Sequence, residues 1–371
     1  MEEEENQISK SKIFFALLIT MFGWGSLWVG NHGFKLAFGD TPIHIPDFKK
    51  IYTANVNVAI DNSDSSTIAS DKDQNIENVN IVSTPNNHNS SSLTIMIGGD
   101  VMLDRGIRLV GEKYGYNTLF ASITPLFKQA DIVAVNLEGP ITSNKSKTLL
   151  ANGKTGKELT FTFSPKVTKT LSDAGITAVS LANNHSNDFG STGLSETRNL
   201  LKKAGIGYFG DYRNSSSTEF ITEKNGFKIA LVGYHYFQPG FDRIVQKVEE
   251  LSSKGYFVLV MPHWDEEYAT SSSPRIREQA RILVSAGAKA ILGSHPHVIL
   301  ERVKIGDMPV FYSLGNLLFD QHFSKEVMKG HLVELVLAKR DDAVFIDKIR
   351  IYETSTESKK GVTVNPTPLD F

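Results

Sequence analysis

From residue 93 onward, the chain repeats one pattern: a short apolar run ends in a polar motif, and a helical pattern follows before the next run. The run 93–97 (LTIMI) stops at the sequence GGD, and the run 176–181 leads to the sequence NNH. Apolar runs of this length are typical of buried strands, and strands alternating with helices predict an α/β domain. In open α/β sheets, ligands bind beyond the carboxyl ends of the strands, so the polar motifs mark the expected site.

The same pattern places the other elements. Further strands are expected at 131–135, 227–232, 257–261, 290–292 and 310–313. Helices are expected at 165–174, 194–204, 244–253 and 274–286. Ser164 and Pro165 suit the N-cap and first position of the first of these helices, and Gly175 suits its end.

Charge and cysteine content exclude several classes of function. Lys and Arg total 39 against 41 Asp and Glu, which gives a net charge of -2 and no basic field for nucleic acid. We therefore expect no nucleic-acid partner. The absence of cysteine rules out disulfides, thiolate zinc sites and a thiol nucleophile. Any metal must be held by His, Asp, Glu or Asn.

The segment 13–30 predicts a membrane anchor. It has 18 residues without a charge, which as a helix would span about 27 Å. Lys10 and Lys12 precede it, and this basic bias places residues 1–12 in the cytoplasm. We expect an uncleaved, single-pass signal anchor in the cell membrane; the alternative is a buried core helix.

A flexible extracytoplasmic linker is predicted at 31–92. Its second half, 61–92, has seven Asn, eight Ser and four Asp in 32 residues and no aromatic residue. Such a segment cannot bury enough apolar surface to offset its chain entropy. The folded, extracytoplasmic domain is expected at 93–355, and a polar tail at 356–371.

Seven polar side chains come from five separate strand ends. They are Asp100, Glu138, Asn184, His185, His263, His295 and His297. Each alone is weak evidence, because strand-end Asp and loop His are common in turns. Together, carboxylate, amide and imidazole groups suit a hard to borderline divalent ion such as Mn, Fe or Zn.

Six ordered segments resemble a known family. They are GGDVMLDRG (98–106), NLEGPI (136–141), SLANNHSNDFGSTGL (180–194), HWDEEY (263–268), GSHPHV (293–298) and YSLGNLLFD (312–320). These segments are similar to the serial motifs of CapA-type poly-γ-glutamate capsule biosynthesis proteins, in the metallophosphoesterase-like superfamily. The resemblance implies a layered α/β/β/α sandwich of the metallo-dependent phosphatase type, preceded by a transmembrane helix and a tether.

The resemblance also implies roles for individual residues. Asp100 and His297 would hold a first ion, Glu138 would bridge two ions, and Asn184, His263 and His295 would hold the second. His185 would protonate a leaving oxygen, a task that suits an imidazole. Asp188 would orient His185 or cap the following helix.

Four further residues of these motifs are candidates for substrate contact. Arg105 would pair with a carboxylate or phosphate of the substrate or form a structural ion pair. Glu267 and Tyr268 keep the family pattern, and Asn316 would form a turn or contact the substrate.

Three positions depart from the superfamily pattern. Met102 stands where a histidine ligand is usual, which leaves open one ion, a weak pair of ions or a pocket kept for binding. Asp104 and Asp265 stand where glycines are usual, and these two carboxylates near the mouth would recruit a cation or be solvated; we expect them to be solvated. A lysine-rich stretch between 145 and 169 is expected to be a solvated loop, or else to gather an anionic chain by salt-sensitive attraction.

Three functions follow. The first is a membrane-anchored component of poly-γ-glutamate capsule synthesis and export, with the anionic polymer, membrane-bound synthase or export subunits and the lipid bilayer as partners. The second is a free-standing divalent-metal hydrolase of phosphoesters or γ-glutamyl amides. The third is a non-catalytic scaffold with a vestigial pocket.

Overall fold

The computed structural model describes residues 37–38, 41–42, 92–149, 156–211, 218–341, 343–357 and 361–371. The chain divides into two compact units, 1–83 and 84–371.

In the first unit, the described residues form two short antiparallel strands, β1 (Ala37–Phe38) and β2 (Thr41–Pro42). The predicted anchor at 13–30 and most of the predicted linker at 31–92 lie outside the described residues. Within the described ranges, no helix has the length and apolar character needed to cross a bilayer.

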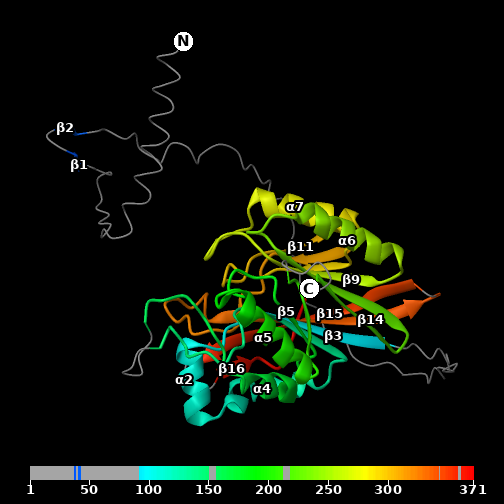
Figure 1. Ribbon diagram of the computed structural model, residues 1–371. Helices are drawn as coiled ribbons and strands as arrows, with labels where there is room; N and C mark the ends of the chain where they lie inside the picture. The colour runs from blue at the N-terminus through cyan, green and yellow to red at the C-terminus, as the bar shows by residue number, and fades with distance from the viewer. Residues whose placement is uncertain are drawn as a thin grey trace, which may run out of the picture. The chain divides into compact units, whose positions relative to one another are not determined.

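Two mixed β-sheets form the second unit (Figure 1). The larger has the order β16-β15-β14-β3-β4-β5-β6, with β13 beside β3 and β17 beside β15. Its strands are β3 (Ser92–Val101), β4 (Ile132–Leu137), β5 (Ala178–Ser180), β6 (Gly207–Phe209), β13 (Asn316–Leu318), β14 (Lys329–Arg340), β15 (Ala343–Glu357), β16 (Gly361–Val364) and β17 (Leu369–Asp370). Strands β3 to β6 are parallel, and β14 to β16 are antiparallel.

The smaller sheet has the order β11-β12-β10-β9-β8-β7. Its strands are β7 (Glu219–Lys224), β8 (Phe227–His235), β9 (Phe257–His263), β10 (Ala290–Leu292), β11 (Arg302–Ile305) and β12 (Met308–Phe311). The four central strands are parallel, and β7 and β11 close the two edges in antiparallel orientation.

Helices cover the outer face of each sheet (Figure 1). On the larger sheet lie α2 (Arg105–Tyr114), η2 (Tyr116–Phe120), α3 (Thr124–Phe127), α4 (Val167–Ala174) and α5 (Gly190–Lys203). On the smaller sheet lie α6 (Phe241–Ser253) and α7 (Pro274–Ser285).

Strand alternation explains this layering. In β9, Val258 and Val260 pack with the α6 and α7 side chains, whereas Leu259 packs with Ile95 and Ile97 of β3 in the core between the sheets. Successive strand residues point to opposite faces, so a strand buried on both sides is a continuous apolar run. The predicted α/β class is confirmed, with four layers in the order helix, sheet, sheet, helix.

Strand β3 continues past the point where the sequence pattern ended it. It runs through Gly98 and Gly99 to Val101, because β13 packs directly beside it with Asn316 opposite Asp100. A Cβ atom at position 99 would lie 1.9 Å from the carbonyl oxygen of Gly315. The glycines therefore allow a close approach of two strands and do not end the strand.

The stretch after residue 355, where the sequence predicted a polar tail, contains strands in the structure. Strand β15 extends to Glu357, and both β16 and β17 pair with it, while Val362 is fully buried. The polar composition of this stretch reflects a sheet edge, where one face is solvated.

Candidate metal centre

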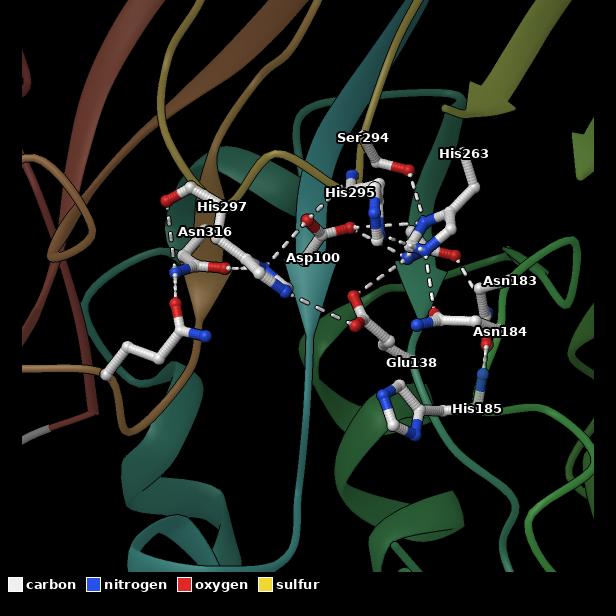
Figure 2. A network of polar contacts seen from close by, with 12 residues as sticks. Asp100, Glu138, Asn183, Asn184, His185, His263, Ser294, His295, His297 and Asn316 are labelled. Carbon is white, nitrogen blue, oxygen red and sulfur yellow. Dashed lines mark hydrogen bonds and ion pairs between the residues drawn. The ribbon is translucent and has the colours of Figure 1, made fainter. Parts of the chain in front are cut away.

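The predicted polar motifs converge where the strands of both sheets end (Figure 2). Asp100 is in β3, and Glu138 directly follows β4. His263 ends β9 of the other sheet, and the loop after β10 carries His295 and His297. The chain thus brings together residues that are up to 197 positions apart, counted from Asp100 to His297.

Asp100, Glu138 and His297 form a compact buried triad. One ligand atom from each lies within 4.8 Å of the others, and all three residues are buried. His297 Nδ1 lies 3.4 Å from Asp100 Oδ2, and His297 Nε2 lies 3.6 Å from Glu138 Oε1. Two carboxylates and an imidazole at this spacing are a candidate site for a divalent ion.

The surroundings of Glu138 also indicate that the triad could hold a cation. Glu138 Oε1 is buried and has no hydrogen-bond partner among the described residues. Burial raises the pKa of Glu138 well above its usual value, because the Asp100 and Glu267 carboxylates add to the desolvation cost and the nearby His297 only partly opposes it. A buried carboxylate with a bare oxygen is costly without a positive partner, and a metal ion would supply one.

His297 is held by Asn316. Asn316 Nδ2 donates to the carbonyl oxygens of His297 and Val327, so its Oδ1 faces His297 Nδ1 at 2.9 Å and accepts. Nδ1 therefore carries a proton, and Nε2, which faces Glu138, is the atom that could bind a metal after losing its own proton. Asn316 is fully buried and does not line the cleft, so its contacts favour positioning of His297 over contact with a substrate.

Neighbouring groups of opposite charge shift the pKa values of Asp100 and His297. Burial works against the Asp100 carboxylate, but the hydrogen bond and charge of His297, with Asn136 and the His295 N–H, outweigh it and lower the pKa of Asp100. Burial also works against protonated His297, but Glu138 and Asp100 outweigh it and raise the pKa of the imidazole to about 9.

A second cluster lies beside the triad. Asn184 Oδ1 is 2.9 Å from His263 Nε2, which is 3.0 Å from His295 Nδ1. Burial and the neighbouring His295 depress the pKa of His263 well below its usual value, and burial and His297 lower that of His295 to about 4. Both imidazoles are therefore neutral near pH 7, the form that binds metals. Figure 2 shows Glu138 between the two clusters.

Asn136 links these clusters, and the sequence motifs gave it no role. Its Nδ2 donates to Asp100 Oδ1 at 2.7 Å and lies 3.3 Å from His263 Nδ1, while Asn183 donates to its Oδ1. Because Asn136 precedes Glu138 by two positions, the period of the strand places both on one face. That spacing was the available signal in the sequence.

His235 was also missed. It ends β8, directly opposite His263 in the β8–β9 register, and its ring centroid lies 6.2 Å from that of His263. Burial, with the charges of His295 and His185, lowers the pKa of His235 to about 4. The sequence pattern ended this strand three residues early, at 232, so its terminal histidine was not counted among the strand ends.

His185 and Asp188 form a polar pair at the mouth of the site. His185 Nδ1 lies 2.9 Å from Asp188 Oδ2, and the same oxygen accepts the Phe161 N–H at 2.6 Å. Helix α5 begins at Gly190 without a side-chain cap. The contacts favour the orienting role of Asp188 over the capping role.

Arg105 lines a cleft that opens onto the triad. Its Nε donates to Asp320 Oδ1 at 2.9 Å, and a second hydrogen bond joins Nη2 to the same oxygen. The guanidinium lies 5.1 Å from the Phe161 ring and 5.5 Å from the Phe319 ring. The ion pair is structural, yet the Arg105 Nη1 group has no hydrogen bond within the described part of the chain.

The cleft has a volume of about 420 Å³ and reaches both Glu138 and His297. His185, Glu267 and Tyr268 line it as well. Burial, with the Glu267 carboxylate, raises the pKa of the Tyr268 hydroxyl, which therefore stays protonated. Its oxygen accepts a hydrogen bond from Gln321 Nε2 at 3.0 Å.

Two expectations about the departures are wrong. Asp104 is fully buried and accepts from Arg108 Nε at 2.8 Å, and Asp265 is 4% exposed and accepts the Ser273 N–H at 2.9 Å. Neither carboxylate is solvated, because the protein itself supplies the donors. Met102 is buried too, and its sulfur accepts the Asp104 N–H at 3.1 Å.

The predicted basic stretch contains five exposed lysines in the described residues: Lys145, Lys147, Lys157, Lys166 and Lys169. Lys169 pairs with Asp173 at 2.7 Å, and Lys147 lies over the Phe189 ring. Lys154 lies outside the described residues. Exposure of these side chains agrees with a solvated loop, and no lysine lines the described part of the cleft.

These observations define the class of protein: a layered α/β protein with a buried centre of carboxylates and histidines at its strand ends. Residues 94–321 match the family described as bacterial capsule synthesis protein PGA_cap. The chain therefore belongs to this family, and the resemblance noted in the sequence is confirmed.

Two curated relatives agree with this assignment. The capsule biosynthesis protein CapA of Bacillus anthracis is 29% identical over 67% of this chain, and the PGA biosynthesis protein CapA of Bacillus subtilis is 30% identical over 69%. The chain spans 65% of the length of the first relative and 71% of the second. The structure is also remotely similar to that of the calcineurin-like phosphoesterase YfkN of Bacillus subtilis. The match covers 72% of this chain and 91% of YfkN, with 15% sequence identity and a TM-score of 0.47.

Replacing Glu138 by Gln separates metal binding from stability. We expect Glu138→Gln to leave the free energy of unfolding of the metal-free protein within about 1 kcal/mol of its original value, because losing the repulsion from Asp100 and the desolvation cost offsets losing the attraction to His297. The same change should abolish the rise in thermal midpoint that Mn²⁺ produces in the unchanged protein. Urea unfolding in EDTA and thermal unfolding with Mn²⁺ measure the two effects.

Glu278→Gln, an exposed residue of α7, is the matched control and should leave both quantities unchanged. A Glu138→Gln protein that keeps the full Mn²⁺ response would contradict the triad as a metal site.

Proposed function

We propose that this chain is a membrane-anchored, extracytoplasmic component of poly-γ-glutamate capsule biosynthesis, with a divalent-metal hydrolase centre of the metallophosphoesterase type. The single observation that carries the proposal is the buried triad of Asp100, Glu138 and His297, which faces an open cleft. Family membership supports the capsule pathway.

Asp100, Glu138 and His297 would hold one ion, and Asn184, His263 and His295 would hold a second, with Glu138 between them. Such ions polarise a substrate oxygen and lower the pKa of a bound water. Mn, Fe and Zn all suit this donor set, which contains oxygen and imidazole nitrogen but no sulfur.

The remaining steps belong to side chains of the cleft. Asp188 accepts from His185 Nδ1, so the proton that His185 delivers to a leaving oxygen is on Nε2. Arg105 is held rigidly by Asp320 and two aromatic rings, and its Nη1 group would receive an anionic substituent of the substrate. Glu267 and Tyr268 would contact the substrate from the opposite wall.

Met102 favours a second candidate, a non-catalytic scaffold. Its sulfur is hydrogen-bonded to the Asp104 N–H, so it supplies no ligand in place of the usual histidine. The first ion would then have only three protein ligands, so it would be held more weakly than the second. A chain that works as a scaffold would keep the pocket only to bind the polymer.

The hydrolase is tested on the purified full-length chain. We expect it to contain a divalent ion by elemental analysis and to hydrolyse p-nitrophenyl phosphate or a γ-glutamyl peptide. His185→Ala should lower kcat by about 10²- to 10⁴-fold, the usual contribution of a general acid, while the metal content stays unchanged. Asp173→Asn, which breaks only an exposed ion pair with Lys169, is the control. Absence of both metal and turnover would overturn the hydrolase.

A cellular test separates hydrolase from scaffold. In cells whose only copy carries Asp100→Ala, we expect loss of the capsule polymer while the protein remains at its normal level. Polymer yield and immunoblotting measure the two quantities. Normal polymer yield in these cells would support the scaffold.

The anchor and its orientation have their own test. The full-length chain should sediment with membranes and resist extraction by salt, because 13–30 would cross the bilayer as an apolar helix. Protease added to intact spheroplasts should digest the domain that follows the linker. A protected domain would reverse the proposed orientation.

A further inference from the structure

Exposed apolar side chains edge the cleft that leads to the metal centre. Phe323 is 68% exposed and Leu159 is 62% exposed, the largest values among the large apolar side chains of the described residues. Tyr268 is 41% exposed, and its ring packs edge-on to Phe323 with centroids 5.2 Å apart. All three line the same cleft, and together they form an apolar rim that is exposed to water.

The apolar surface continues inward to the reacting groups. The Phe161 ring lies 4.3 Å from the His185 ring, and the Phe319 ring lies 4.7 Å from the His297 ring. These two phenylalanines also flank the Arg105 guanidinium. Phe161 and Phe319 both line the cleft, so its wall beside Arg105 is apolar as well.

The charges of the cleft favour a single anionic group at its inner end. Arg105 is the only Lys or Arg that lines the described cleft, whereas Glu138, Glu267 and Asp320 all do. A chain with a carboxylate on every unit would meet like charges along these walls. An anionic group joined to an apolar chain would meet opposite charge at the inner end and apolar surface elsewhere.

We propose that the cleft binds an amphiphile: a phosphate or diphosphate ester of an alkyl or polyisoprenyl chain. The chain lies along Leu159, Tyr268 and Phe323, and the phosphate reaches Arg105 and the metal ligands. The proposal rests on the proposed function, because that function places the reacting phosphate at the metal centre.

Binding of short alkyl phosphates to the full-length, Mn²⁺-loaded protein tests the proposal. Ethyl, butyl and hexyl phosphate differ only in their methylene groups, and calorimetric titration gives a Kd for each. Burial of one methylene strengthens binding about 4-fold, so hexyl phosphate should bind at least about 10-fold more tightly than ethyl phosphate even if only part of its chain is buried. The same ratio is expected in EDTA-treated protein, because the rim does not depend on the metal.

Rim substitutions locate the effect. Leu159→Ser and Phe323→Ser should each reduce the ratio of hexyl to ethyl affinity by several-fold. Ile282→Ser on α7 and Leu369→Ser on β17 remove exposed apolar side chains of similar size that do not line the cleft, and they should leave the ratio unchanged.

Equal affinities for ethyl and hexyl phosphate would overturn the proposal, as would a chain-length gain that both rim variants retain. Tight binding of a γ-linked glutamate oligomer, unaffected by Phe323→Ser, would also overturn it in favour of the polymer. A protein that binds hexyl phosphate by this pattern but hydrolyses no ester would support the amphiphile cleft and contradict only the hydrolase.

Discussion

The close approach of two buried carboxylates is the constraint on which the centre depends. Asp100 and Glu138 offer oxygens within 4.8 Å of each other, and at an effective dielectric constant of 20 two full charges at that distance repel by about 3 kcal/mol. His297 offsets part of this repulsion, but Glu138 Oε1 has no hydrogen bond within the described residues. The fold thus holds two carboxylates in an arrangement that a divalent cation would stabilise.

The rest of the architecture keeps that arrangement rigid. Glycine at 99 lets β13 pack against β3, which places Asn316 beside Asp100 and lets it hold His297. From the other side, Asn136 joins Asp100 to His263 and so connects the two sheets. Amide side chains suit this work because they donate and accept without adding charge to a site already rich in carboxylates.

Outside the buried centre, aromatic side chains line the inner part of the cleft. Phe161 and Phe319 contact the two imidazoles that face the cleft and also flank Arg105. The same rings line the cleft whose rim carries Leu159, Tyr268 and Phe323, so apolar side chains lie both at the mouth of the cleft and beside the imidazoles.

The sequence by itself determined the α/β class, the central parallel strands and the polar residues at their ends, because apolar runs and the motifs that follow them are local patterns. It left open the roles of Asp188, Arg105 and Asn316, and it did not find Asn136 or His235. Only the tertiary structure showed the contacts of these side chains. Several of these side chains have their partner on another segment, as Arg105 has in Asp320 and Asn316 in His297. It also showed that Asp104 and Asp265 are buried, because their donors come from loops that fold over them.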